Sequence, residues 1–134
     1  IMTLNIRVIA PDRTVWDANA EEVILPSSTG QLGILTGHIP LLTALDIGVM
    51  RVRIDKDWVP IVLMGGFAEI DNNKITILVN GAEETIDIDI SLAQKNLEEA
   101  TAKLTQAIST KDKIEATQNI RKARARLQAV VTIN

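Results

Sequence analysis

The chain has 134 residues, a length typical of one domain or of one domain with a small appendage. It contains no Cys, which excludes disulfides, thiol catalysis and Cys-ligated zinc from this chain. The aromatic residues are Trp16, Trp58 and Phe67 alone, so the core must be aliphatic and base-stacking platforms for single-stranded nucleic acid are not expected.

The charges are spread unevenly along the chain, whose formal net charge is −3. Residues 81–109 carry two basic and six acidic residues, whereas residues 110–134 carry six basic and two acidic ones. A basic C-terminal segment behind an acidic one favours an acidic protein partner or docking onto the chain itself, and the acidic remainder disfavours nucleic acid.

Apolar residues alternate with polar ones in the first part of the chain. Leu4, Ile6 and Val8 are separated by Asn5 and Arg7. The same period recurs at 23–25 and 50–54. A period of two is typical of half-buried strands.

Turn residues separate the later strands. Asp55-Lys56-Asp57 predicts a turn, and the mostly apolar segment 58–64 predicts a strand in which Pro60 marks an edge or a bulge. Asn72-Asn73 predicts a tight hairpin because Asn tolerates positive φ. Short strands without intervening helices indicate an all-β sandwich or barrel.

Residues 30–42 contain Gly30, Gly33, Gly37 and Pro40 within an apolar stretch, which predicts a tightly shaped loop. His38 lies in this loop and is the one histidine of the chain. It either hydrogen-bonds the loop backbone or forms a surface contact with a partner.

The hydrophobic period becomes helical near residues 86–91 and predicts two helices that form an antiparallel hairpin. Asp89 or Ser91 can cap the first helix, and Thr110 or Asp112 the second. Apolar residues spaced by four and three form a narrow seam on each helix: Ala93, Leu97, Ala100, Leu104 and Ala107 on the first, and Ala116, Ile120, Ala123, Leu127 and Val130 on the second.

These seams are rich in Ala, and an Ala contact buries little apolar area, so the hairpin should be weakly held. Two interpretations remain open: a hairpin packed permanently on the sandwich, and an arm that can detach and extend along a partner. Four cations lie together on the second helix, Arg121, Lys122, Arg124 and Arg126. They form either a solvated helix face or a docking surface for acidic groups.

The sequence offers no set of catalytic groups. Its serines have no local base partner, Gly65-Gly66 alone is too weak a signal for a phosphate loop, and Glu21-Glu22 would point to opposite faces of a strand. Clusters of His or carboxylates for a metal are absent as well. We therefore expect no catalysis, no metal, no cofactor and no small-molecule substrate.

Three segments together resemble the ε subunit of F-type ATP synthases: GQLGILTGHIPLLTALDIGVMRVR, LMGGFAEIDNNKITILVNGAE and the hairpin that ends in RKARARLQAV. The resemblance covers nearly the whole chain, and VIAPDRTVWD and IRKARARL are similar to cyanobacterial or plastid versions. It implies an N-terminal β-sandwich over residues 1–87 and a C-terminal helical hairpin over residues 88–134.

The resemblance also implies partners. The sandwich would bind the γ subunit and the ring of c subunits, with Gln31 and His38 as contact candidates. The hairpin would extend into the α/β hexamer and block ATP hydrolysis, with Arg121, Lys122, Arg124 and Arg126 meeting an acidic segment of the β subunit. The subunit would be a non-catalytic part of the rotor that couples proton transport to ATP synthesis, peripheral to the thylakoid membrane on its stromal or cytoplasmic side.

Some relatives bind ATP on the folded hairpin, and the resemblance places the matching positions at Glu83, Asp89, Ala93 and Arg126. The motif's Arg position is Leu92 here, which cannot pair with phosphate, so we expect weak or no ATP binding. The alternative function, of another class, is a free-standing β-sandwich protein-binding module with a coiled appendage. A small hydrolase is a third possibility, which lacks a nucleophile and base.

Overall fold

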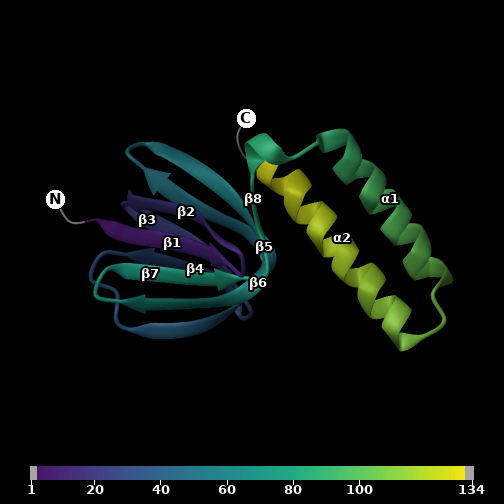
Figure 1. Cartoon of the computed structure of the whole chain (residues 1–134), viewed down its shortest axis with the longest axis horizontal. Helices are drawn as coiled ribbons and strands as arrows, with labels where there is room; N and C mark the ends of the chain where they lie inside the picture. The colour runs from purple at the N-terminus through teal and green to yellow at the C-terminus, as the bar shows by residue number, and fades with distance from the viewer. Residues whose placement is uncertain (1–2, 132–134) are drawn as a thin grey trace.

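The computed structural model describes residues 3–131, which form a β-sandwich followed by a helical hairpin, as predicted (Figure 1). The strands are β1 (Leu4–Ala10), β2 (Arg13–Ala20), β3 (Glu22–Ser27), β4 (Gly30–Leu35), β5 (Leu41–Ile54), β6 (Asp57–Asp71), β7 (Lys74–Val79) and β8 (Ala82–Glu84). A 3₁₀ turn, η1 (Thr85–Asp87), leads to the helices α1 (Ile90–Gln106) and α2 (Thr110–Val131).

The sandwich is built from one hydrogen-bonded sheet in the order β2-β1-β7-β6-β5-β3-β4, with β8 also paired to β6. All pairings are antiparallel except that of β1 with β7. The long strands β5 and β6 run through both halves of the sandwich. The first half of β6 pairs with β8 over residues 61–63, and its second half pairs with β7 over residues 66–71. The bend of β6 between these partners falls at Gly65 and Gly66, which both have positive φ.

Alternation explains the core. In β1, Leu4, Ile6 and Val8 are fully buried and Arg7 between them is exposed. The core cluster is aliphatic, as the scarcity of aromatics predicts, and draws on strands from both halves of the sheet.

Two predicted turns are confirmed. Asn72 and Asn73 have φ of 51° and 62° and connect β6 to β7, and Asp55 has φ of 57° between β5 and β6. The edge predicted at Pro60 is also found: Pro60 lies opposite Arg51 of β5, and the pairing of β6 with β8 begins only at Ile61.

The prediction that residues 30–42 form a loop was wrong for most of its length. Gly30–Leu35 is strand β4, which pairs with β3 along its whole length, and only residues 36–40 connect it to β5. Leu32 and Ile34 point toward the core and alternate with exposed residues, so the period of two outweighs the glycines. The strand β2 was not predicted, because its sequence shows little apolar alternation.

The helices begin at residues that satisfy free amides. Asp89 caps α1 by accepting a hydrogen bond from the Leu92 amide at 3.1 Å, as one of the two predictions had it. For α2 the prediction of Thr110 or Asp112 was wrong, because the Ser109 hydroxyl accepts from the Asp112 amide at 3.1 Å. The helices have 17 and 22 residues, so the second arm of the hairpin is the longer one.

The hairpin is folded against the sandwich, with α2 lying between the sheet and α1 (Figure 1). Of the predicted seams, Ala93 and Ala100 on α1 and Ala116, Ile120 and Ala123 on α2 are buried. The other predicted seam residues, Leu97, Leu104, Ala107, Leu127 and Val130, are only partly buried. The contact between the helices thus depends mainly on alanines.

Candidate functional site

The contact between hairpin and sandwich is a small apolar cluster. Ala125 and Ala129 of α2 pack on Val49 of β5 and Val62 of β6, and all four are buried. Three partly buried residues complete the cluster: Ile47, Met64 and Ile88. Because Val49 and Val62 are direct cross-strand partners, this cluster is a flat platform on the outer face of the sheet.

The sequence did not predict the α2 half of this platform. Ala125 and Ala129 are spaced by four, as residues on one helix face are, but they lie outside the seam that faces α1. The signal that would have found them is a second stripe of small residues on α2. A second such stripe indicates a helix that is covered on two sides.

An ion pair lies beside the platform. The guanidinium of Arg126 donates to both carboxylate oxygens of Glu83, with Nε–Oε1 at 2.8 Å and Nη2–Oε2 at 2.7 Å. Both side chains are mostly buried, with 26% and 29% of their surface exposed. The hydrogen bond that Arg126 donates to Glu83 raises the pKa of Arg126 above its usual value, against the opposing effect of burial.

The four nucleotide-binding candidates, Glu83, Asp89, Ala93 and Arg126, lie together in the structure. They line one shallow hollow of about 350 Å³ with Asp87, Ile88, Leu92 and Asn96. However, Glu83 and Arg126 bind each other, and the Asp89 carboxylate caps α1. Three carboxylates and an exposed Leu92 make this hollow unsuited to a polyphosphate.

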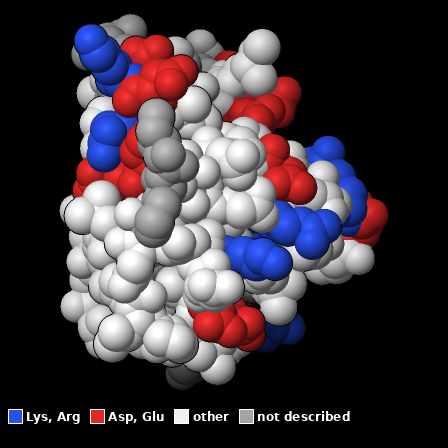
Figure 2. Space-filling model, turned by 90° about the vertical axis from the view of Figure 1, so that its left-hand side faces the viewer, with Lys and Arg blue, Asp and Glu red and all other residues white. Residues whose placement is uncertain are grey.

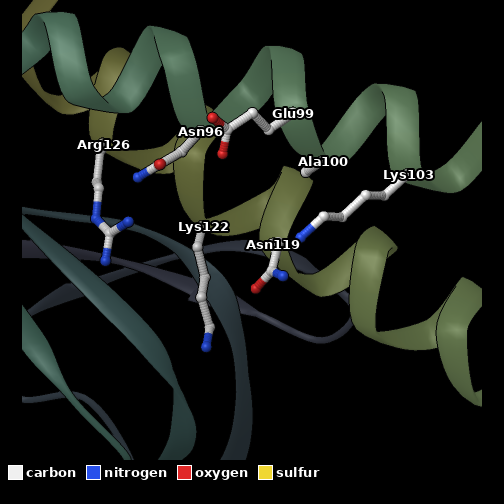
Figure 3. A pocket seen from close by; sticks show the side chains of 7 residues that line it. All are labelled: Asn96, Glu99, Ala100, Lys103, Asn119, Lys122 and Arg126. Carbon is white, nitrogen blue, oxygen red and sulfur yellow. The ribbon is translucent and has the colours of Figure 1, made fainter.

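The four clustered cations of α2, residues 121, 122, 124 and 126, do not share one surface. Arg121 and Arg124 are exposed, while Lys122 and Arg126 are half-buried. Lys122 and Arg126 line a groove of about 260 Å³ between the helices, together with Lys103 of α1 (Figure 3). The remaining lining residues are Asn96, Glu99, Ala100 and Asn119. Three cations and one carboxylate therefore surround this groove.

Gln31 and His38 lie near opposite ends of β4: Gln31 pairs with Pro26 beside the β3–β4 turn, and His38 lies in the loop that follows Leu35. The loop 36–40 lies beside the β6–β7 turn, because the Gly37 amide donates to Asn73 Oδ1 at 2.7 Å, and this end of the sandwich points away from the helices (Figure 1). His38 Nδ1 lies 2.7 Å from the Ile39 carbonyl oxygen, which agrees with the loop-backbone alternative for this side chain. Gln31 is exposed on β4.

This end of the sandwich carries exposed apolar side chains. Leu35, Ile39 and Leu42 expose 54%, 73% and 67% of their surface. Figure 2 faces this end and shows an uncharged area at its lower left, with charged groups at the top, on the right and near the bottom.

A second apolar row crosses the outer face of the sheet. Ala44, Phe67, Leu78 and Ile9 are successive cross-strand partners on β5, β6, β7 and β1. Phe67 and Leu78 expose 56% and 53% of their surface, and the row borders a groove of about 690 Å³. The sequence did not single out this row, because its members come from four separate strands.

Within residues 3–131 the structure contains no group of three or more His, Cys, Asp or Glu side chains that could hold a metal ion. None of the described helices is long and apolar enough to cross a membrane.

Comparison with known families matches both parts of the chain. Residues 3–85 match the model of the ATP synthase Delta/Epsilon chain β-sandwich domain, and residues 87–130 match that of its long α-helix domain. The chain is 77% identical over 128 residues to the "ATP synthase epsilon chain, chloroplastic" of Porphyra purpurea, with 96% of each chain covered. It is 63% identical over 131 residues to the "ATP synthase epsilon chain" of Thermosynechococcus vestitus, covering 96% and 95%.

Solved structures share the fold. A chain of the Euglena gracilis mitochondrial ATP synthase superposes with a TM-score of 0.84 at 22% identity, covering 96% of this chain and 81% of that one. A chain from the Tetrahymena thermophila mitochondrial ATP synthase central stalk gives 0.67 at 14% identity, covering 96% of both. The two family models and the identity to the epsilon chains extend over nearly every described residue, and on these grounds the chain belongs to the ATP synthase delta/epsilon family.

Proposed function

We propose that this chain is the ε subunit of the F-type ATP synthase of a chloroplast or cyanobacterium, a non-catalytic part of the central rotor. Support comes from the 77% identity to chloroplast epsilon chains over almost the full length. The subunit would be peripheral to the thylakoid membrane through its complex, on the stromal or cytoplasmic side. This assignment leaves the free-standing binding module as the second candidate.

The sandwich would hold the subunit on the rotor. The apolar side chains of Leu35, Ile39 and Leu42 suit a contact with the ring of c subunits, together with the candidate His38. The candidate Gln31 lies near the other end of β4. The apolar row through Phe67 and Leu78 suits the γ subunit, because a side surface leaves the end of the sandwich free for the ring. On this proposal, residues 1–87 form the domain that binds γ and the ring, and residues 88–134 form the regulatory domain.

The hairpin would act as a brake on ATP hydrolysis. The observation that carries this part is the small platform of Val49, Val62, Ala125 and Ala129, which holds the hairpin by few apolar groups. A hairpin held so weakly can leave the sandwich when a partner offers comparable contacts. Its folded and extended positions would therefore be two populations in equilibrium. The exposed Arg121 and Arg124 are available to an acidic segment of the β subunit in either position.

We propose that ATP does not regulate this hairpin by binding to it. Arg126 is already bound to Glu83, and Leu92 is an apolar side chain in the position where the binding motif has Arg. Carboxylates line the hollow that the candidates form.

Removal of the hairpin tests the brake. A chain truncated after Ile88 is expected to bind γ as before, because the proposed contact surfaces remain, and to raise the ATP hydrolysis of a reconstituted F1 complex. Hydrolysis rates and co-purification with γ check this, with the full chain in parallel. Unchanged inhibition by the truncated chain would contradict the role of the hairpin as a brake. A full chain that does not co-purify with γ would contradict the rotor assignment.

A second test concerns the cations. Replacing Arg121 and Arg124 by Ala should weaken inhibition about three- to tenfold at low ionic strength, since each surface ion pair contributes ~0–1 kcal/mol. The double variant Lys111→Ala, Lys113→Ala removes the same charge from the start of α2 and serves as the control. The inhibition constant of F1 measured at two salt concentrations checks the effect, and equal constants for both variants would rule out a specific role for these arginines.

A further inference from the structure

The Glu83–Arg126 ion pair joins the two parts of the molecule. Among the ion pairs of residues 3–131, it is the one between hairpin and sandwich, since Arg7–Asp17 and Arg53–Glu22 both lie within the sandwich. Its geometry is bidentate, with both distances below 3 Å. Pairs of this kind combine charge assistance with a fixed geometry and are stronger than single neutral hydrogen bonds.

The surrounding contact gives this pair unusual weight. The apolar platform contributes only the alanines Ala125 and Ala129 from the helix side. Glu83 belongs to β8, which is hydrogen-bonded to β6, so its carboxylate is anchored to the sheet. Arg126 lies in α2 between the two alanines. Breaking the pair therefore removes a large part of what holds α2 to the sheet.

The pair also offsets a repulsion. Arg126 lies one helical turn from Lys122, and both line the groove that also receives Lys103, with Glu99 as the one carboxylate there. Like charges one turn apart on a helix destabilise it. Removing Glu83 would leave three cations around the groove without this counter-ion, whereas removing Arg126 would relieve part of the crowding.

We propose that the Glu83–Arg126 pair is the latch of the hairpin, and that its two halves contribute unequally. Glu83 is the carboxylate that pairs with Arg126, and the folded hairpin brings Lys122 and Lys103 to the same groove as this arginine. Arg126 cannot bind Glu83 and an acidic partner at once, so release of the hairpin and capture of this side chain by a partner are one event. The consequence for the ATP synthase rests on the proposed function, but the latch is a property of the isolated chain.

The absence of Cys permits a direct test on the isolated full chain. Ala129 is fully buried in the platform, between α2 and the sheet. In an Ala129→Cys background, the single thiol should therefore react with a soluble disulfide reagent only when α2 lifts from the sheet. Labelling rates then report the open fraction. We expect Glu83→Gln to raise this rate about tenfold and Arg126→Gln about threefold, in line with the strength of hydrogen bonds to charged groups. Glu83→Gln keeps the size of the side chain and removes its charge, whereas Arg126→Gln removes the guanidinium together with part of the side chain's length.

Two controls complete the design. Glu22→Gln breaks the half-buried Arg53 pair inside the sandwich, at 3.4 Å, and should leave the rate unchanged. The exchanged pair Glu83→Arg, Arg126→Glu should return the rate toward that of the parent. A rate for Glu83→Gln within twofold of the parent would overturn the latch. A larger increase for Arg126→Gln than for Glu83→Gln would overturn the unequal roles. Because no other subunit is present, these outcomes are separate from those of the truncation test.

Discussion

Substitution of Gly66 by alanine is expected to destabilise the sandwich strongly. A Cβ at this position would lie 2.0 Å from the Leu78 carbonyl oxygen and 2.8 Å from the Val79 Cα. These are backbone atoms of β7, the strand paired with β6 here, so no side chain can move to make room. Residue 66 also has φ of 156°, where L side chains are rare.

The expected loss is at least about 4 kcal/mol of the free energy of unfolding, against a typical total of about 5–15 kcal/mol for a domain. Urea unfolding followed by Trp fluorescence measures this loss. Gly33→Ala is the matched control, because a Cβ at Gly33 meets nothing within 4 Å and its stability should change by less than about 0.5 kcal/mol. A Gly66→Ala chain as stable as the Gly33→Ala chain would show that β6 and β7 are not this close.

Ala129→Leu is expected to detach the hairpin and leave the sandwich folded. Ala129 has no exposed surface and lies against Val49 and Val62, so three further carbons have no space. Overpacking of this kind costs about 1–3 kcal/mol, which would raise the open fraction about 5- to 150-fold. Hydrogen exchange should increase in the last turns of α2 and remain unchanged in β1 and β7.

The control is Ala102→Leu, the same change at an exposed position of α1. On the proposed function, the Ala129→Leu subunit should also inhibit ATP hydrolysis more strongly than the parent, because more of its hairpins are available to extend. Exchange in α2 equal to that of the Ala102→Leu chain would mean that the platform can open to accept the leucine.

The fold could largely be predicted from the sequence, because its determinants are local. Alternation at Leu4, Ile6 and Val8 predicts a strand with one buried face, and Asn72-Asn73 predicts a turn with positive φ. The errors at β2 and β4 have different causes: β2 shows little apolar alternation, whereas the glycines of β4 drew attention away from its period of two. Both are edge strands, and their place is set by pairing with β1 and β3.

The candidate site could be predicted less well, because its contacts are distant in sequence. Glu83 and Arg126 are 43 residues apart, and only their positions in a family motif linked them beforehand, as nucleotide ligands rather than as partners of each other. The same limit applies to the row of Phe67 and Leu78, whose apolar residues become neighbours only when four strands pair side by side. The Ser109 cap was missed because Ser109, Thr110 and Asp112 are all residue types that cap helices, and each would cap an amide two or three residues further on.

The order of layers has a mechanical consequence. The outer helix α1 contacts mainly α2, and it joins the sandwich through Ile88 and Asp89. Once α2 lifts, α1 becomes a lever about 26 Å long, pivoted at these two residues, since a helix rises about 1.5 Å per residue. A rotation of about 20° at the pivot would carry the far end of the hairpin about 9 Å. A small rotation at this short joint would thus produce a large displacement at the tip of the hairpin.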